Sequence, residues 1–499
     1  MRPPHHRQLH GTGRRLRAAA SLAGIGLTLG GCVGFSPDAG LGPAREYAAL
    51  DLRKHVVKVA DVEGALSAGA QTDMLLRRPL TPDSAVQVAL LKNRGLQAAF
   101  NDLGVSEAQY VQATLPPAPR LSITQWGLGF NTEIERSVAA SLLDLATLPA
   151  RAEIARDRFR ADQYHAAEQV LRLAGEARRQ FYRTVAANQA TAFLEQALAG
   201  AESSAMLAKQ LGETGALNKL EQAREQAFYS ELGAQLGKAR VQQRAERERL
   251  TRLLGLWGRE TDFRLPNGLP ALPARLVPGG EIETEAMRKR TDVQAARFEL
   301  HSLAGQYGLS QVSSFVSVFD VGFANRFSRS RMPGTADAPP TIDKKSLNGF
   351  TGDLTIPIYD FGTSTIQGAS EAYLASANRL AERAVNARSE VREAWQRYRG
   401  QYDITRHYQA SVLPLRKTVQ DQALLQYSGM LIDVTTLIVD ARARILSSIQ
   451  AIEARRDFWI AATDLQAATL GGGYSGGSFG GEAPGANTGS SLAIATPGG

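Results

Sequence analysis

The side chains best suited to chemistry in this chain are a single cysteine and seven histidines among 499 residues. One cysteine excludes an internal disulfide framework and any multi-cysteine zinc or iron–sulfur site. Three histidines crowd the extreme N-terminus, and the other four are scattered without the spacing of metal ligands. There is no Walker-type phosphate loop and no HExxH motif, and paired carboxylates occur only within helical charge patterns. The chain is therefore predicted to be no enzyme and to carry no cofactor or metal.

The cysteine, Cys32, follows a segment with the pattern of a secretory signal. Five arginines and no acidic residue form its head, and an apolar stretch from Ala18 to Leu29 leads to Gly30 and Gly31. This order resembles the lipobox of bacterial lipoproteins, where the chain is cleaved directly before a cysteine and that cysteine is acylated. Several acyl chains at one cysteine anchor a protein firmly to a membrane. Cys32 is thus the expected lipidation site, and the alternative is an ordinary signal peptide with a chance cysteine.

The formal net charge of +8 would usually suggest nucleic-acid or membrane-surface binding. Five of the 57 Lys and Arg residues and none of the 49 acidic residues precede Cys32, so cleavage there lowers the charge to +3. Most of the apparent nucleic-acid signature is therefore the head of the signal. No nucleic-acid partner is predicted.

The remaining chain divides by composition and hydrophobic period into a leader, two similar blocks and a tail. No apolar run of about 18 residues occurs, so no transmembrane helix is expected. The predicted organisation is a signal peptide (1–31), an anchored leader (32–79), a first repeat (80–268), a Pro-rich linker (269–280), a second repeat (281–470) and a disordered Gly/Ser-rich tail (471–499).

The two blocks look like copies of one module. Residues Ala89–Ala99 align without gaps on Ala286–Ala296, and each opening helix is followed by two strand-like runs and two long helical stretches, 149–256 and 363–468. The helical stretches carry coiled-coil spacing with Ala-rich seams, which indicates an extended rod or tube. The seam positions are Leu380, Ala384, Ala387, Val391, Ala394 and Tyr398, then Ile438, Ala441, Ile445, Ser448, Ile452, Arg455, Trp459 and Ala462. A soluble coiled coil is the alternative at this point.

The strand-like runs favour a membrane. They are predicted at 121–130, 136–145, 313–327 and 350–359, and transmembrane barrel strands need about 9–11 residues. In the last run Phe350, Leu354, Ile356 and Ile358 alternate with Thr351, Asp353 and Thr355, and in the first Trp126, Leu128 and Phe130 alternate with Gln125, Gly127 and Gly129. A small soluble sheet capping a helical rod is the alternative. Since about eight strands are the minimum for a barrel, several copies would have to share one.

Together these motifs resemble the TolC-type outer-membrane efflux protein family, over roughly Leu80 to Leu470. The motifs are LTPDSA at 80–85, LQAAF at 96–100, RTDVQAA at 290–296, LTIPIYDFG at 354–362, Leu413-Pro414, and Tyr427-Ser428-Gly429. The resemblance implies a mainly α fold with β strands: a duplicated helix–strand–strand–helix–helix module, with a long α-helical coiled-coil barrel and a transmembrane β-barrel of twelve strands shared by a homotrimer. It also implies a periplasmic adaptor (membrane fusion protein) and an inner-membrane pump as partners.

The resemblance further places a gate at the periplasmic tip, around the helix–helix turn of each repeat. Those turns contain Gly215 and the pair Tyr427 and Gly429, and the carboxylates beyond the second turn are Asp433 and Asp440. Asp433 could equally be a first-turn carboxylate favoured by the helix dipole. Tyr427 could be a packing residue or part of the gate.

The predicted function is a passive exit duct of a tripartite efflux or type I secretion-like system, lipid-anchored in the outer membrane and extending into the periplasm. The alternative is a lipid-anchored periplasmic coiled-coil scaffold or adaptor without a pore. The pairs of amphipathic strands favour the duct.

Overall fold

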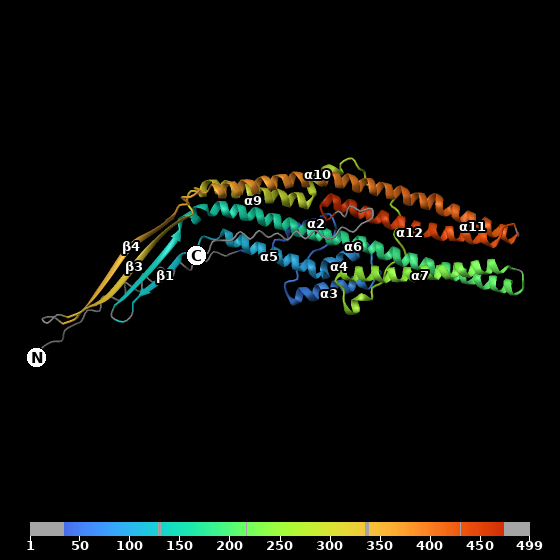
Figure 1. Cartoon of the computed structure of the whole chain (residues 1–499), viewed down its shortest axis with the longest axis horizontal. Coiled ribbons are helices and arrows are strands. Elements are labelled where there is room, and N and C mark those ends of the chain that lie inside the picture. Colours follow the sequence, from blue (N-terminus) through green and yellow to red (C-terminus); the bar gives the residue numbers. More distant parts are fainter. Residues whose placement is uncertain are drawn as a thin grey trace.

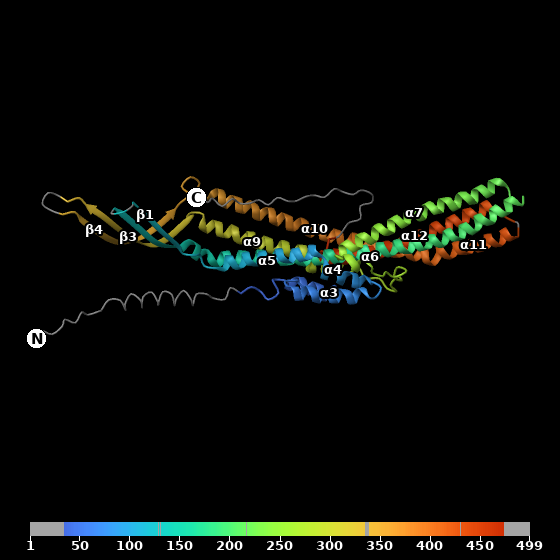
Figure 2. The same ribbon diagram turned by 90° about the horizontal axis from the view of Figure 1, so that it is seen from below.

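The computed structural model describes residues 34–473 except Leu128, Phe130, Ala216, residues 335–338 and Met430. A long helical body continues at one end into a four-stranded sheet (Figure 1 and Figure 2). The predicted signal peptide, Cys32 and the tail from residue 474 onward lie outside the described residues. The chain is mainly helical with one small antiparallel sheet, as the predicted fold class requires.

The helix–strand–strand–helix–helix order occurs twice. Two short helices, α2 (Gly42–Leu50) and α3 (Val62–Leu76), precede the first copy. That copy contains α4 (Pro82–Lys92), α5 (Arg94–Thr114), β1 (Arg120–Trp126), β2 (Thr132–Ser141), α6 (Leu142–Glu213) and α7 (Lys219–Leu254). The second contains α8 (Ile282–Lys289), α9 (Thr291–Ser313), β3 (Val318–Met332), β4 (Thr341–Thr355), α10 (Thr363–His407), α11 (Leu413–Ser428) and α12 (Val434–Leu470), with a π-helical segment, Tyr408–Val412, between α10 and α11.

The aligned opening segments of the two copies break at the same position. Asn93 separates α4 from α5 and Arg290 separates α8 from α9, with φ and ψ of −66° and 116° at Asn93 and −59° and 121° at Arg290. The Asn93 amide donates to the Leu253 carbonyl at the end of α7, and the Arg290 guanidinium donates to the Ala468 carbonyl at the end of α12. Each break therefore binds the last helix of its own copy.

A left-handed glycine completes each of these junctions. Gly255 ends α7 at φ +70° and Gly471 ends α12 at φ +87°. A Cβ on Gly255 would lie 2.7 Å from the Lys92 carbonyl oxygen, and one on Gly471 would lie 2.8 Å from the Thr291 hydroxyl. Both the backbone angle and the close approach thus require glycine.

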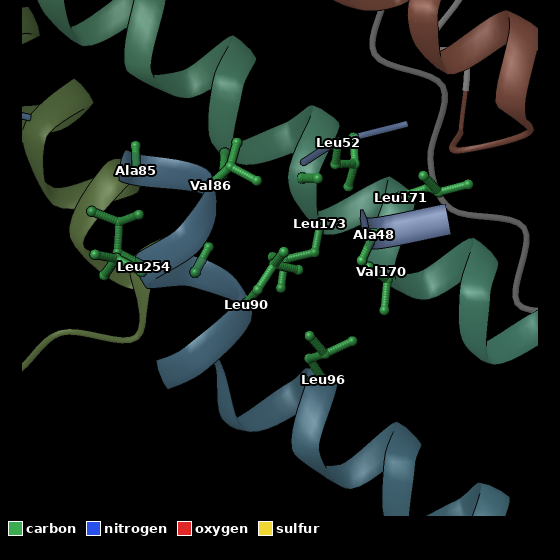
Figure 3. Close-up of a cluster of buried hydrophobic side chains, with 14 of the residues drawn as sticks. Ala48, Leu52, Ala85, Val86, Leu90, Leu96, Val170, Leu171, Leu173 and Leu254 are labelled. Atoms are coloured by element: carbon green, nitrogen blue, oxygen red, sulfur yellow. The ribbon is translucent and has the colours of Figure 1, made fainter. Parts of the chain in front are cut away.

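The largest buried cluster lies where α4 meets α6 and the C-terminal end of α7 (Figure 3). Val86 and Leu90 of α4, Val170 of α6 and Leu254 of α7 are fully buried. Burial of one such side chain contributes about 1.5–3 kcal/mol. The cluster therefore fixes the opening helix of the first copy against the long helices, midway between the sheet and the far tip (Figure 1).

The strand boundaries differ from those expected from the sequence. The expected runs 121–130, 136–145, 313–327 and 350–359 correspond to β1 at 120–126, β2 at 132–141, β3 at 318–332 and β4 at 341–355. Phe130, the expected end of the first run, lies outside the described residues. The long helices also begin earlier than residue 149, since α6 starts at Leu142 and contains Pro149.

The boundary error after β2 has a local cause. Leu142, Leu143 and Leu145 form a short apolar run, and periodicity cannot distinguish such a run in a strand from one in a helix. The Ser141 hydroxyl accepts a hydrogen bond from the Asp144 amide and so caps α6 at that point. With 72 residues, α6 spans about 108 Å at 1.5 Å per residue.

An ionic contact joins α6 to the second copy. His165 Nε2 lies 2.9 Å from Glu299 Oε1 on α9, and Nδ1 lies 3.6 Å from Glu168. Arg383 on α10 approaches the same Glu299 at 3.5 Å. Hydrogen bonds to Glu168 and Glu299 outweigh the opposing effect of burial and raise the pKa of His165 to about 9. His165 is thus cationic at neutral pH, although its side chain is 40% exposed.

We expect this contact to make stability depend on pH in the alkaline range. Because the pKa of His165 rises from 6.5 in the unfolded chain to about 9, its contribution is complete below 6.5 and is lost as pH rises through about 9. The His165→Gln variant should therefore unfold at a lower temperature than wild type below pH 6.5, with the gap closing above pH 9. The exposed neighbour His301, replaced by Gln, is the matched control. A gap that is constant across this range would contradict the assignment.

Candidate functional site

The sheet has one apolar face, defined by the pairing register. The strand order is β1-β2-β3-β4 with antiparallel neighbours throughout, and residues directly opposite each other share a face. The apolar face carries Leu121, Ile123, Ile134, Val138, Phe319, Val321, Phe323, Phe327, Phe350 and Leu354. Leu121, Ile123 and Phe350 are 73%, 76% and 87% exposed in this chain. A patch this large that is left uncovered marks a protein or membrane contact.

The opposite face of the sheet is polar and contains several ion pairs. It carries Ser122, Thr124, Glu133, Glu135, Ser137, Asp320, Arg326, Ser328, Thr351 and Asp353. Arg326 lies 3.1 Å from Glu133 and 3.0 Å from Glu135, and Arg120 lies 3.7 Å from Asp320. The alternation expected for the last strand is present: Phe350 and Leu354 lie on the apolar face, and Thr351, Asp353 and Thr355 lie on the polar face.

Three expected strand positions are wrong. Trp126 was expected on the apolar face, but the register places it opposite Glu133 on the polar face. The apolar positions of β1 are instead Leu121 and Ile123, because the strand begins its alternation one residue out of phase with the expected set. Ile356 and Ile358 lie beyond the end of β4 at Thr355. Leu128 and Phe130 lie outside the described residues.

Both helix–helix turns lie at the end of the body farthest from the sheet (Figure 1). Gly215 lies in the α6–α7 turn at φ +76°, and a Cβ there would meet nothing within 4 Å. Gly429 ends α11 with its amide donating to the Leu425 carbonyl at 3.0 Å. Tyr427 packs against the buried cluster that contains Phe228 and Ile438, together with Leu217 from the other turn. One small core therefore joins the two turns.

The candidate gate carboxylates occupy different positions on α12. Asp433 is its N-cap: Oδ1 accepts from the Thr436 amide at 2.9 Å and from the Thr436 hydroxyl at 2.6 Å. Asp440 lies in the second turn of α12 and is half-buried. The capping contact gives Asp433 a structural role at the N-cap, just before the first turn in which the helix-dipole interpretation placed it. Its role in a gate stays a prediction.

A groove between α7 and α12, just behind the tip, was not predicted from the sequence. Its volume is about 200 Å³, and Phe228, Leu232, Ile445, Leu446 and Ile449 are among its lining residues. Arg442 of α12 lies 5.1 Å from the ring centre of Phe228 and 3.0 Å from Glu231 of α7. Burial raises the pKa of the neighbouring Glu225 carboxyl, and Arg442 opposes this effect. The groove unites residues from both copies, so no local motif signals it.

A larger cavity continues this groove toward the middle of the body. It has a volume of about 570 Å³ and shares Ile449 with the groove. Charged side chains from α6, α7 and α12 line it: Arg183, Glu246, Arg249, Glu453, Arg456 and Asp457. Burial lowers the pKa of Arg183. The cleft between the α6–α7 pair and α12 thus changes from apolar near the tip to ionic farther in.

The described part of the chain contains no group of three or more His, Cys, Asp and Glu side chains placed to hold a metal ion. Among the same residues, no helix is both long and apolar enough to cross a bilayer. The geometry that stands out is therefore the two-faced sheet at one end and the paired turns at the other.

Solved outer-membrane channels have the same architecture. CusC, whose structures concern folding and transmembrane channel formation, superposes with a TM-score of 0.66 at 17% identity, covering 79% of this chain and 92% of CusC. The Campylobacter jejuni outer membrane channel CmeC gives 0.65 at 15% identity, over 79% and 87% of the two chains. The Vibrio cholerae outer membrane protein VceC gives 0.64 at 14% identity, over 81% and 97%. No family model and no curated protein matches the sequence.

The chain has the TolC-type fold. The resemblance inferred from the sequence motifs is thereby confirmed at the level of the fold. In this fold the two-faced sheet, the long helices and the paired turns belong to one continuous architecture, and the chain spans most of the length of each similar structure.

Charge and capping at Asp433 can be separated by substitution. Asn caps helices as well as Asp does, whereas Ala costs about 1 kcal/mol at an N-cap. We therefore expect Asp433→Ala to lower the free energy of unfolding by about that amount, and Asp433→Asn to leave it unchanged. Chemical denaturation measures both, and Asp440→Ala, within the helix, is the control. Equal destabilisation by the Asn and Ala variants would contradict the capping assignment. Altered cation selectivity of Asp433→Asn alone would show a gating role.

Proposed function

We propose that this protein is a passive outer-membrane channel, the exit duct of a tripartite efflux or type I secretion-like system. The observation that carries the proposal is the sheet with one apolar face, one polar face and two unpaired edges. An apolar face toward lipid and a polar face toward water is the pattern of a water-filled transmembrane barrel. The TolC-type fold supports this function.

The edges of the sheet make oligomerisation a physical requirement of the proposal. β1 and β4 each have a neighbour on one side only. Unpaired backbone groups are not tolerated in lipid, and about eight strands are needed to close a barrel. Copies must therefore join β4 of one chain to β1 of the next. We infer a homotrimer with one twelve-stranded barrel, as the family resemblance implies.

The far end of the helical body is the proposed contact with the rest of the system. A periplasmic adaptor would dock near the tip, where the groove beside Phe228 and Arg442 separates α7 from α12. An apolar groove with a charged rim is a common recognition surface for a partner helix. Energy for transport would come from an inner-membrane pump, and the channel itself would perform no chemistry.

The start of the described chain supports a lipid anchor at Cys32. The Ser36 amide donates to Glu107 of α5 at 2.6 Å, and Gly40 lies against Phe159 of α6. Glu107 is about 10 Å along the helix from the sheet-side end of α5 at Thr114. The four residues from Ser36 back to Cys32 can extend by about 14 Å. An acyl chain on Cys32 could therefore reach the membrane that surrounds the sheet.

Removing the lipid distinguishes a channel from a lipid-anchored scaffold. The Cys32→Ser variant, made with an ordinary cleavable signal peptide in place of residues 1–31, lacks the acylation site but keeps the whole sheet. We expect this variant to need detergent for extraction from membranes, to purify as a trimer and to conduct ions in planar bilayers as wild type does. The reason is that the apolar face, not the acyl chain, holds the proposed barrel in the bilayer.

The scaffold alternative predicts the opposite behaviour. A Cys32→Ser protein that is released into buffer without detergent, as a monomer without conductance, would overturn the channel. Wild-type protein extracted in detergent serves as the reference for size and conductance.

A further inference from the structure

Four cations lie on the apolar face of the sheet: three lie near the ends of β3 and β4 that are joined to each other, away from the helices, and the fourth lies midway along the sheet, in the row of Asn325. They are Arg136 of β2, Arg329 and Arg331 of β3, and Lys344 of β4, here called the basic cluster. The register places Arg329 directly opposite Lys344.

The carboxylates of the strands show the reverse distribution. All five acidic side chains on the described strands, Glu133, Glu135, Asp320, Asp343 and Asp353, belong to the polar face. Four of them pair with cations of that same face, for instance Asp343 with Lys345 at 3.2 Å. The apolar face therefore combines cations with a complete lack of acidic residues over its described positions. This segregation fits an anionic environment outside the sheet.

The depth of the basic cluster fits the edge of a bilayer. From Thr355, at the end of β4 next to the helical body, Asn348 is seven residues away. That is about 23 Å along the strand, or about 18 Å along the membrane normal at a tilt of about 40°. Arg136 and Asn348 both lie in the row of Asn325. Lys344 lies about 10 Å farther out by the same measure. Arg136 and Lys344 therefore lie on either side of the far border of an apolar band about 25 Å high.

We propose that the basic cluster binds the phosphate-bearing headgroups of the lipid leaflet that surrounds the far end of the barrel. Arg side chains hold phosphate oxygens with two parallel N–H bonds, and Lys binds them as a point charge. Arg136 reaches the inner side of the headgroup layer, while Arg329, Arg331 and Lys344 reach its outer side. The sheet is thereby fixed in depth as well as inserted. This inference rests on the proposed function, because it needs the sheet in a membrane.

A matched pair of double variants tests the proposal. Arg136→Gln with Lys344→Gln removes two cations from the apolar face, and Arg120→Gln with Lys345→Gln removes two from the polar face. Each protein is reconstituted in vesicles of equal parts phosphatidylcholine and phosphatidylglycerol, re-extracted, and assayed for retained lipid. Wild type and the polar-face variant should be enriched in phosphatidylglycerol. In the apolar-face variant the enrichment in phosphatidylglycerol should be about fivefold lower for each cation removed.

Salt supplies a second measurement that needs no substitution. At about 1 M salt the Debye length falls to about 3 Å, so wild type should also lose its phosphatidylglycerol. The proposal would be overturned if both variants retained phosphatidylglycerol equally, if both lost it equally, or if its retention by wild type did not change with salt. Conductance in vesicles of phosphatidylcholine alone distinguishes failure of the lipid site from failure of the proposed channel. If the protein conducts there but the lipid-retention results contradict the proposal, only the lipid site is overturned. Wild type that never conducts sinks the proposed function and the lipid site together.

Discussion

The unpaired edges of the four-stranded sheet are the constraint on which the proposed assembly depends. β1 and β4 each present backbone N–H and C=O groups with no neighbouring strand in the chain. The apolar face between them requires a nonpolar environment, in which those groups cannot remain unsatisfied. Pairing the two edges between copies satisfies both requirements at once. The polar face, with Arg326 held between Glu133 and Glu135, then lines the interior.

The helical body is built so that the sheet and the tip lie at opposite ends. Each copy of the module breaks its opening helix at one aligned position, Asn93 or Arg290, and ties that break to the end of its last helix. Glycines at 255 and 471 allow the close approach. Both strand pairs therefore leave the body in the same direction, and both helix–helix turns meet at the far end around one small core. Duplication thus yields one sheet and one tip.

The sequence patterns predicted which segments form helices and strands far better than they predicted which residues of each segment face the core. The seam Ala387, Val391, Ala394 and Tyr398 is buried as expected, because alternating spacings of four and three select one face of a helix. Farther along α12 the expected Trp459 and Ala462 are only half-buried, whereas Phe458 and Ala461 are buried against α10, because α12 contacts both α10 and α6 and buries more than one stripe of residues. Trp126 was misplaced by a one-residue phase error in its strand. The tip groove could not be predicted, because Phe228 and Arg442 meet only in the folded chain.

The most direct test of the account is the pairing of the two sheet edges. Cryo-electron microscopy of the protein in lipid nanodiscs would show it at the level of individual strands. The account predicts a closed ring in which β4 of each copy is hydrogen-bonded to β1 of the next, with Phe350 and Leu121 facing lipid. A single chain whose β1 and β4 edges stay unpaired, or a ring closed through the helices with the sheets apart, would contradict it.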